Sequence, residues 1–167
     1  MALSDHWLPD TDIHPIDIVE SMATAADWDF DRVAEDQIAM TVTGQWRDYA
    51  ITLAWSDRDQ VLRLISTFEM NPPADRLAAL YEALNLANDQ LWDGSFTFWA
   101  DQGLMVWRYG LMLAGDQAAA PEQIERMIVA AVEGAERFYP AFQLACWGNT
   151  TPAQAMGVAI AGAYGRA

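Results

Sequence analysis

The sequence predicts an α+β fold in which an antiparallel sheet carries its helices mainly on one face. Two patterns predict this class: several short segments alternate large apolar residues with small or polar ones, and longer segments repeat apolar residues at helical spacing. The spacers between the first strand segments are too short for the crossovers that parallel strands require, so we expect antiparallel pairing. Strands grouped between helices give the order α-β-β-β-β-α-β-β-α, followed by a C-terminal tail helix.

A helix and four strands are expected first. The helix spans about residues 15–26, because Pro15 suits the first helical position and Ile18, Met22 and Ala26 recur at four-residue spacing. In the first three strands the large side chains share one face of a sheet, and turns containing Gly or acidic residues separate the segments. The four strands follow at about residues 28–31, 38–43, 49–55 and 61–68.

The middle of the chain predicts a second helix and two more strands. The helix begins after Asn71, which can cap it, and leucines from Leu77 to Leu91 form its buried stripe. The strands follow at about residues 96–99 and 104–113. The last strand is apolar on both faces apart from Arg108, which is typical of a strand placed centrally in a sheet.

The C-terminal part predicts a third helix and the tail helix. The third helix begins near Pro121 and should end or kink at Pro140, because an internal proline removes a backbone hydrogen bond and clashes with the preceding turn. Thr151 and Pro152 mark the start of the tail helix. The expected organisation is a flexible acidic arm at residues 1–12, an α+β domain at residues 13–148 and a tail helix at residues 149–167.

Charge and residue usage exclude several classes of protein. The 167 residues have a formal net charge of −15, and residues 1–36 contain ten acidic residues against Arg32 alone. Such a surface repels phosphates, so we expect no binding to nucleic acid or to anionic membranes. The chain has no Lys, which excludes a P-loop lysine and a Schiff-base lysine. The single cysteine, Cys146, allows no intrachain disulfide, and we expect a cytoplasmic protein.

Possible metal ligands gather near the N-terminus. His6, Asp10, Asp12 and His14 lie within nine residues and have the side chains that bind Zn²⁺ or Mn²⁺. A solvated terminal arm explains the same residues without a metal, and that interpretation is favoured. We therefore expect no metal and no cofactor.

Two further groups have the chemistry of a catalytic site. Asp29 and Asp31 share one face of a strand and could work as an acid–base pair, although strand alternation alone explains them. Cys146 could be a nucleophile, but its apolar surroundings favour a buried, inert thiol. We therefore expect no catalytic residue.

Aromatic residues and one arginine support an interaction hypothesis. Trp99 should lie on the sheet face opposite the helices, while Trp107 and Tyr109 share one side of the last strand and Arg108 the other. Trp, Tyr and Arg are typical anchors of protein interfaces. Two alternatives stay open: the core takes most of the aromatic rings, or they form an exposed patch. Arg108 likewise either lies flat on the open face or binds a partner's carboxylate.

The tail helix offers a second candidate surface. Met156, Ile160 and Tyr164 share one of its faces. This face either docks onto the core of the same domain or acts as an arm that swaps into a second subunit or binds another protein. The candidate binding residues for a protein partner are Trp99, Trp107, Arg108, Tyr109, Met156, Ile160 and Tyr164.

Parts of the sequence resemble the YbjN-like family. The similarity is densest in residues 85–99 (NLANDQLWDGSFTFW) and 103–109 (GLMVWRY), and it continues at 121–123 (PEQ), 136–143 (ERFYPAFQ) and 147–148 (WG). It extends over about residues 13–163. The resemblance implies a fold like that of type III secretion chaperones and a label as a bacterial sensory transduction regulator, and it implies no catalytic residue.

This resemblance, the lack of a catalytic motif and the aromatic residues favour a non-enzymatic protein-interaction module. It would be chaperone-like or regulatory, homodimeric, and bound to a protein partner. The alternative is a small-ligand-binding protein or enzyme with a pocket between the helices and the sheet, near Arg108.

Overall fold

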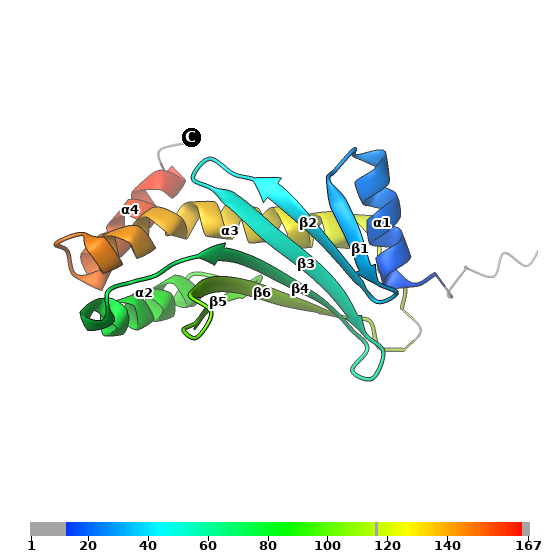
Figure 1. Ribbon diagram of the computed structural model, residues 1–167, viewed down its shortest axis with the longest axis horizontal. Helices are drawn as coiled ribbons and strands as arrows, with labels where there is room; N and C mark the ends of the chain where they lie inside the picture. Colours follow the sequence, from blue (N-terminus) through cyan, green and yellow to red (C-terminus); the bar gives the residue numbers. More distant parts are fainter. Residues whose placement is uncertain (1–12, 116, 165–167) are drawn as a thin grey trace, which may run out of the picture.

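The computed structural model describes residues 13–115 and 117–164 and confirms the α+β class. Figure 1 shows the elements in their expected order, with a single 3-10 turn, η1, inserted before α2. Their bounds are α1 (Pro15–Ala25), β1 (Phe30–Ala34), β2 (Gln37–Thr43), β3 (Asp48–Ser56), β4 (Val61–Glu69), η1 (Ala74–Arg76), α2 (Leu77–Asp89), β5 (Ser95–Trp99), β6 (Leu104–Met112), α3 (Pro121–Trp147) and α4 (Pro152–Tyr164).

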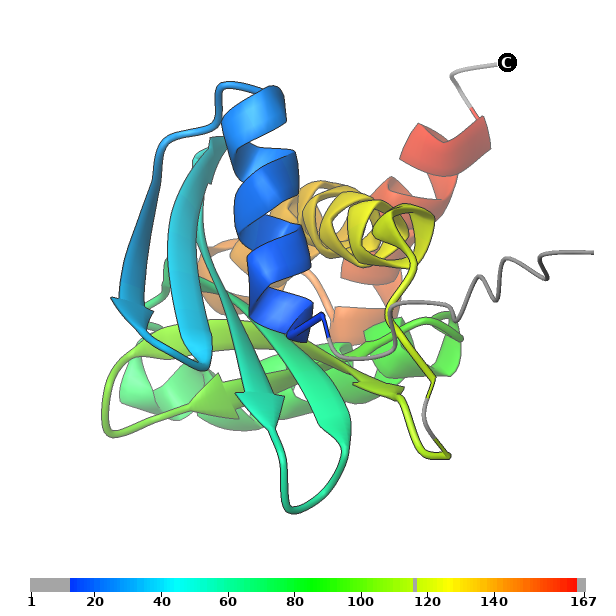
Figure 2. The ribbon, with the colours of Figure 1, turned by 90° about the vertical axis from the view of Figure 1, so that its right-hand side faces the viewer.

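The strands form one sheet of six antiparallel strands in the order β1-β2-β3-β4-β6-β5. The sheet curves around α3, which Figure 2 shows nearly end-on, and α1 lies beside α3 on the same inner face. At one end of the sheet, α2 and α4 pack against α3 and against each other. The last strand, β6, is interior as its two-sided apolar pattern predicts, with β4 on one side and β5 on the other.

The first helix is held to the edge strand by charge. The Nδ1 atom of His14 accepts a hydrogen bond from the backbone N–H of Ile16 and caps α1. The guanidinium of Arg32 in β1 contacts the carboxylates of Asp17 and Glu20, with N–O distances of 2.6 Å to each. These two acids raise the pKa of Arg32. The acidic head of the chain is therefore joined to the sheet through its single basic residue.

The core lies between the inner face of the sheet and α3. One row of inward side chains, fixed by the strand register, runs across four strands through Ile38, Leu53, Leu64 and Tyr109. These residues face apolar positions along nearly the whole of α3. The register therefore brings the alternating pattern of each strand onto one face, as the sequence predicts.

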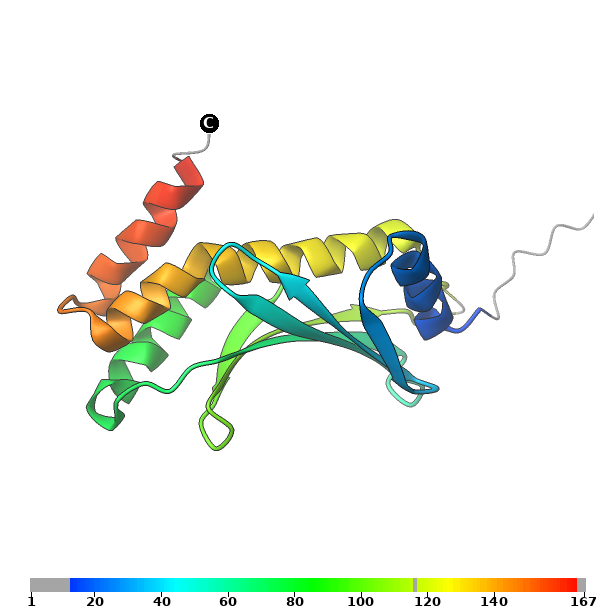
Figure 3. The ribbon, with the colours of Figure 1, turned by 45° about the horizontal axis from the view of Figure 1, so that its top comes forward.

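The third helix continues through Pro140, which corrects the expectation that it ends there. Twelve residues of α3 are buried, and they include Phe138 before the proline and Phe142 after it, both packed edge-on against Phe96. Burial of these rings outweighs the single backbone hydrogen bond that Pro140 cannot donate. Figures 1 and 3 show α3 bending gently towards its C-terminal end, so the expected kink takes the form of a bend.

The tail helix docks onto its own domain. Thr151 and Gln154 form a capping box at the start of α4, each side chain accepting a hydrogen bond from the other's backbone N–H. Ala155, Met156 and Ala159 are at most 3% exposed and belong to the same core cluster as the sheet. Within the described residues, no helix is both long and apolar enough to span a membrane.

Candidate interaction surface

The outer face of the sheet is the surface that no described helix covers. Its side chains are fixed by the register in two central rows. The first row consists of Ala39, Thr52, Ile65, Arg108 and Ser95, and the second of Thr41, Ala50, Thr67, Val106 and Thr97. We call these ten residues the outer sheet patch. Nine of the ten are uncharged, and most are small.

The charge of the outer sheet patch differs from that of the rest of the molecule. Acidic residues on this face lie at its margins: Asp31 on the edge strand, and Asp48 and Glu69 near the strand ends. Near the centre stand Arg63, which pairs with Asp59, and Arg108. Within the part of the chain that the structure describes, Arg108 makes no hydrogen bond or ion pair. In a protein of net charge −15, this face offers an unpaired cation.

Two apolar side chains on the outer face of the sheet differ in how far they are exposed. Val106 is fully buried although it faces away from α3, and it lies outside the main core cluster. Trp99, at the edge of the sheet opposite Leu104, is 36% exposed. The patch therefore presents methyl and hydroxyl groups, with the exposed Arg108 among them and one indole at the margin.

The candidate binding residues of the sheet lie on two different faces in the structure. Trp99 and Arg108 lie on the outer face, as expected. Trp107 is 1% exposed and faces α3, which corrects the expectation that its ring is available to a partner. Tyr109 also faces α3, is half-buried and stacks near Trp107.

Trp107 is fixed in the core by two glycines. A Cβ atom at Gly94 would lie 2.1 Å from the indole ring, and one at Gly134 would lie 3.2 Å from the indole Nε1. Gly94 also has a φ of 155°, which L side chains rarely adopt. The helix and the loop before β5 approach this ring so closely that only glycine fits at Gly94.

The tail residues divide between the core and the surface. Met156 is buried, Ile160 is 42% exposed, and Val158, which the sequence analysis did not single out, is also 42% exposed. Tyr164 is the last described residue of α4, and its side chain is outside the described part. The expected apolar face thus docks through Met156 and leaves Ile160 accessible.

A hydrogen-bond network that the sequence analysis missed joins the β2–β3 hairpin to α3. The carboxylate of Glu136 accepts hydrogen bonds from the backbone N–H groups of Gln45 and Trp46 and from the Tyr49 hydroxyl. Burial, followed by the hydrogen bond to Glu136, raises the pKa of Tyr49 above its ordinary value of 10.0. Trp46 in turn stacks on Tyr139 of α3. These partners lie about ninety positions apart in the sequence, so no local pattern reveals them.

The residues considered as a nucleophile, as metal ligands or as an acid–base pair form no reactive site among the described residues. Burial raises the pKa of the Cys146 thiol to about 11, so the thiol stays protonated and unreactive near neutral pH. His14 caps α1, while His6, Asp10 and Asp12 lie outside the described residues. Asp29 and Asp31 are both exposed near the edge strand.

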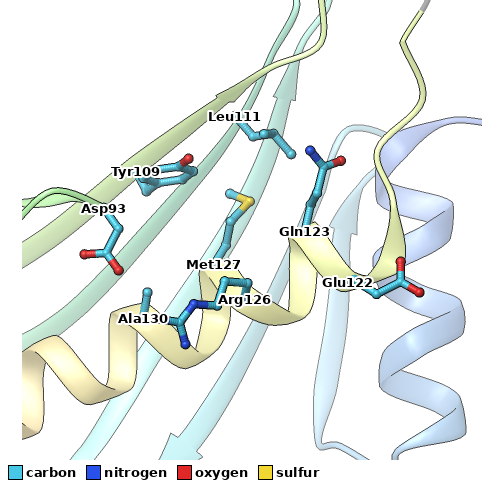
Figure 4. Close-up of a pocket in the computed structure, with 8 residues that line it drawn as sticks. All are labelled: Asp93, Tyr109, Leu111, Glu122, Gln123, Arg126, Met127 and Ala130. Carbon is cyan, nitrogen blue, oxygen red and sulfur yellow. The ribbon is translucent and has the colours of Figure 1, made fainter.

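An open groove runs between β6 and the first half of α3. Its volume is about 330 Å³, and Figure 4 shows Tyr109 and Leu111 on one wall with Met127 rising from α3 between them. Asp93 and Arg126 lie at its margin. Arg108 faces the other side of the sheet, so the expected pocket exists without the arginine that was expected beside it.

The fold and this surface define an α+β protein with an open sheet face and no membrane-spanning helix among its described residues. The chain belongs to the YbjN family, whose model, described as "Putative bacterial sensory transduction regulator", matches residues 15–144. A comparison with curated proteins finds no match.

Two solved structures are similar in fold. The first is YbjN, "a putative transcription regulator from E. coli", with 11% sequence identity and a TM-score of 0.52, covering 90% of this chain and 93% of that one. The second is the HopA1–SchA chaperone–effector complex, with 16% identity and a TM-score of 0.48, covering 71% of this chain and 87% of that one. At these identities the likeness concerns the fold alone.

Proposed function

We propose that this protein is a non-enzymatic, cytoplasmic protein-interaction module, chaperone-like or regulatory, that holds a partner protein on the outer sheet patch. The observation that carries the proposal is Arg108, an unpaired cation in the otherwise uncharged outer sheet patch, which no described helix covers. Arginine is among the residues that most often anchor protein interfaces.

The chemistry of the patch indicates the kind of partner. Small Ala and Thr side chains allow close approach by an apolar surface, and the planar guanidinium of Arg108 can bind a carboxylate through two parallel hydrogen bonds. The partner surface should therefore be mainly apolar with an Asp or Glu near its centre. Trp99 would contact the margin of that surface.

Site-specific photo-crosslinking in cells tests this proposal. A crosslinking residue replaces Thr67, on the outer sheet patch, or Glu82, which is exposed on α2. We expect a discrete crosslinked protein from position 67 that position 82 does not give. Arg108→Glu should weaken that complex roughly tenfold or more, because a charge-assisted hydrogen bond contributes about 1.5–3 kcal/mol.

Arg58→Glu is the matched control, because Arg58 is exposed in the turn between β3 and β4 and the change in charge is the same. The proposal is wrong if positions 67 and 82 give the same products, or if Arg108→Glu and Arg58→Glu have equal effects.

We also propose that the chain forms a homodimer through the exposed side of α4. Val158 and Ile160 leave apolar surface accessible on a helix whose other face is buried in the core. The two side chains are two positions apart, so they flank the buried face of α4 on either side. A second copy related by a twofold axis, the commonest symmetry of soluble oligomers, could pack over this helix and contact them.

A second candidate function is binding of a small ligand in the groove between β6 and α3. Its volume lies at the lower end of the range for ligand sites, and its apolar walls carry the Tyr109 hydroxyl and Arg126 as polar groups. A thermal-shift screen of small anionic and aromatic compounds tests it. A stabilising compound whose effect disappears in Met127→Trp, which fills the groove, would favour this function.

A further inference from the structure

A second groove lies between the sheet and α3, on the side of the helix opposite to that shown in Figure 4. Its volume is about 510 Å³. Its apolar lining comes from three elements: the segment before β1, the end of β2 and the middle of α3. The residues are Trp28, Met40, Val42, Ile128, Val129 and Val132.

One wall of this groove is a strand edge without a partner strand. The register of β1 with β2 begins at the pair Phe30–Met40, so residues 41–43 of β2 pair with β3 alone. These residues line the groove. Their backbone groups on the side of the groove therefore face no other strand, and such an edge is a template for another extended chain.

The rim of the groove is acidic. Asp27, Asp29 and Glu133 line it, and no basic side chain does. The side chains of Asp27 and Asp29 are exposed and make no hydrogen bond or ion pair with the described residues. Glu133 has only a loose contact of 3.9 Å with the exposed Arg126. The groove thus combines apolar walls with uncompensated negative charge.

From this combination we infer that the groove binds an extended segment of another protein that alternates apolar and basic side chains. Apolar side chains of the segment fill the space between Val42 and Val132, and its Arg or Lys side chains reach Asp27 and Asp29. Its backbone pairs with residues 41–43 of β2, which only a polypeptide can do. Thr41 is the one residue that this site shares with the outer sheet patch.

The charge of the groove distinguishes its ligand from that of the outer sheet patch. The patch centres on a cation and selects an acidic partner surface, whereas the groove selects a basic one. Apart from Thr41, the two sites consist of different residues, so a variant at one site need not disturb the other. They would allow the protein to hold two different segments at once.

The test uses the full chain and a short peptide in which Val and Arg alternate. We expect calorimetry to show binding that weakens with added salt, because exposed charge pairs are screened. Peptides in which Glu replaces Arg, or Ser replaces Val, should not bind. Hydrogen exchange at residues 41–43 should slow when the Val-Arg peptide is added.

Asp27→Asn together with Asp29→Asn removes two rim charges and should weaken binding roughly fivefold, as expected for two exposed ion pairs. Asn also tolerates the positive φ of 55° at residue 27, so the fold should be kept. The matched control is Asp75→Asn with Asp101→Asn, two exposed acids outside the groove. This control and Arg108→Glu should bind the peptide as the unchanged protein does.

Equal binding of the Glu-containing peptide, equal effects of the two Asn pairs, or protection of amides elsewhere would overturn the inference. A fall in oligomer mass on adding the peptide would also overturn it, because the groove would then hold a second copy of the chain. Loss of the crosslink at position 67 with intact peptide binding would count against the proposed function alone.

Discussion

Single carboxylates decide how distant parts of this protein are joined. Glu136 shows this most clearly, since its two oxygens accept hydrogen bonds from the tip of the β2–β3 hairpin and from Tyr49. A charged acceptor with several donors keeps its charge at little cost even where it is partly removed from water. The hairpin is therefore held at a fixed height above α3, beside the groove that we propose as a peptide site.

Replacing Tyr49 with Phe should lower the free energy of unfolding by about 2 kcal/mol, because a hydrogen bond to a charged group is lost. The pKa of Tyr49 is raised in the folded state above its ordinary value of 10.0, so its contribution is complete below pH 10 and is lost as the pH rises further. Urea unfolding at neutral pH and above pH 10 checks both effects.

The Phe variant should lose less stability than the unchanged protein as the pH rises above 10. Phe98→Leu is a suitable control, because it alters a partly buried aromatic residue of β5 without touching this network. An unchanged pH dependence in the Tyr49 variant would contradict the assigned role of the hydroxyl.

Strands and helices follow their apolar periodicity closely, and packing overrules one helix stop signal. Alternation correctly predicts which side chains of β2 and β3 face the core, because the register preserves the period of two. Pro140 is a strong stop signal by itself, yet α3 extends beyond it because the residues on both sides are buried. Local chemistry is therefore overruled where packing contributes more free energy than one hydrogen bond.

At the same scale, the exposed side of α4 leads to a prediction about assembly. Val158→Ser with Ile160→Ser should raise the dissociation constant of the proposed homodimer roughly tenfold or more, because each copy would bury less apolar area. Both side chains are 42% exposed in the single chain, so the fold should tolerate the change. Sedimentation equilibrium over a range of concentrations measures the effect.

The matched control is Ala153→Ser with Ala161→Ser, two exposed positions on the same helix. A chain that is monomeric at every concentration, or equal dissociation constants for both double variants, would exclude α4 as the dimer interface.

Charge is the dominant property of the molecule as a whole. The net charge is −15, and it is concentrated away from the centre of the outer sheet patch. Such an excess keeps a protein soluble but destabilises the compact state through repulsion between like charges. Because the acidic residues are unevenly distributed, the outer sheet patch carries a cation while the rim of the groove proposed as a peptide site carries only acids.

This charge predicts a stability that rises with salt. The melting temperature should increase by a few degrees between about 10 mM and 200 mM NaCl, because the screening length falls from roughly 30 Å to below 10 Å. Calorimetric melting curves check it. A variant in which Asp75, Asp101 and Glu125, three exposed acids, become amides should show a smaller increase, and a melting temperature that falls with salt would contradict the prediction.

The sequence by itself determined the class of fold, the order of the elements and the family. These depend on periodicity, turn residues and recognisable segments, which are local properties. It also placed Trp107 and Arg108 on opposite sides of their strand, since alternation along a strand needs no tertiary information. Which of these two sides faces α3 followed only once the sheet, Gly94 and Gly134 were packed together.

Tertiary structure alone decided where grooves form and what lines them. The proposed peptide site joins residues 27–29, 40–43 and 128–133, and the network of Glu136 joins residues 87 to 91 positions apart. Contacts across such separations depend on how the sheet curves around α3, which no local pattern encodes. The acidic head and the apolar stripes were visible in the sequence, but only the fold shows that they meet beside an unpaired strand edge.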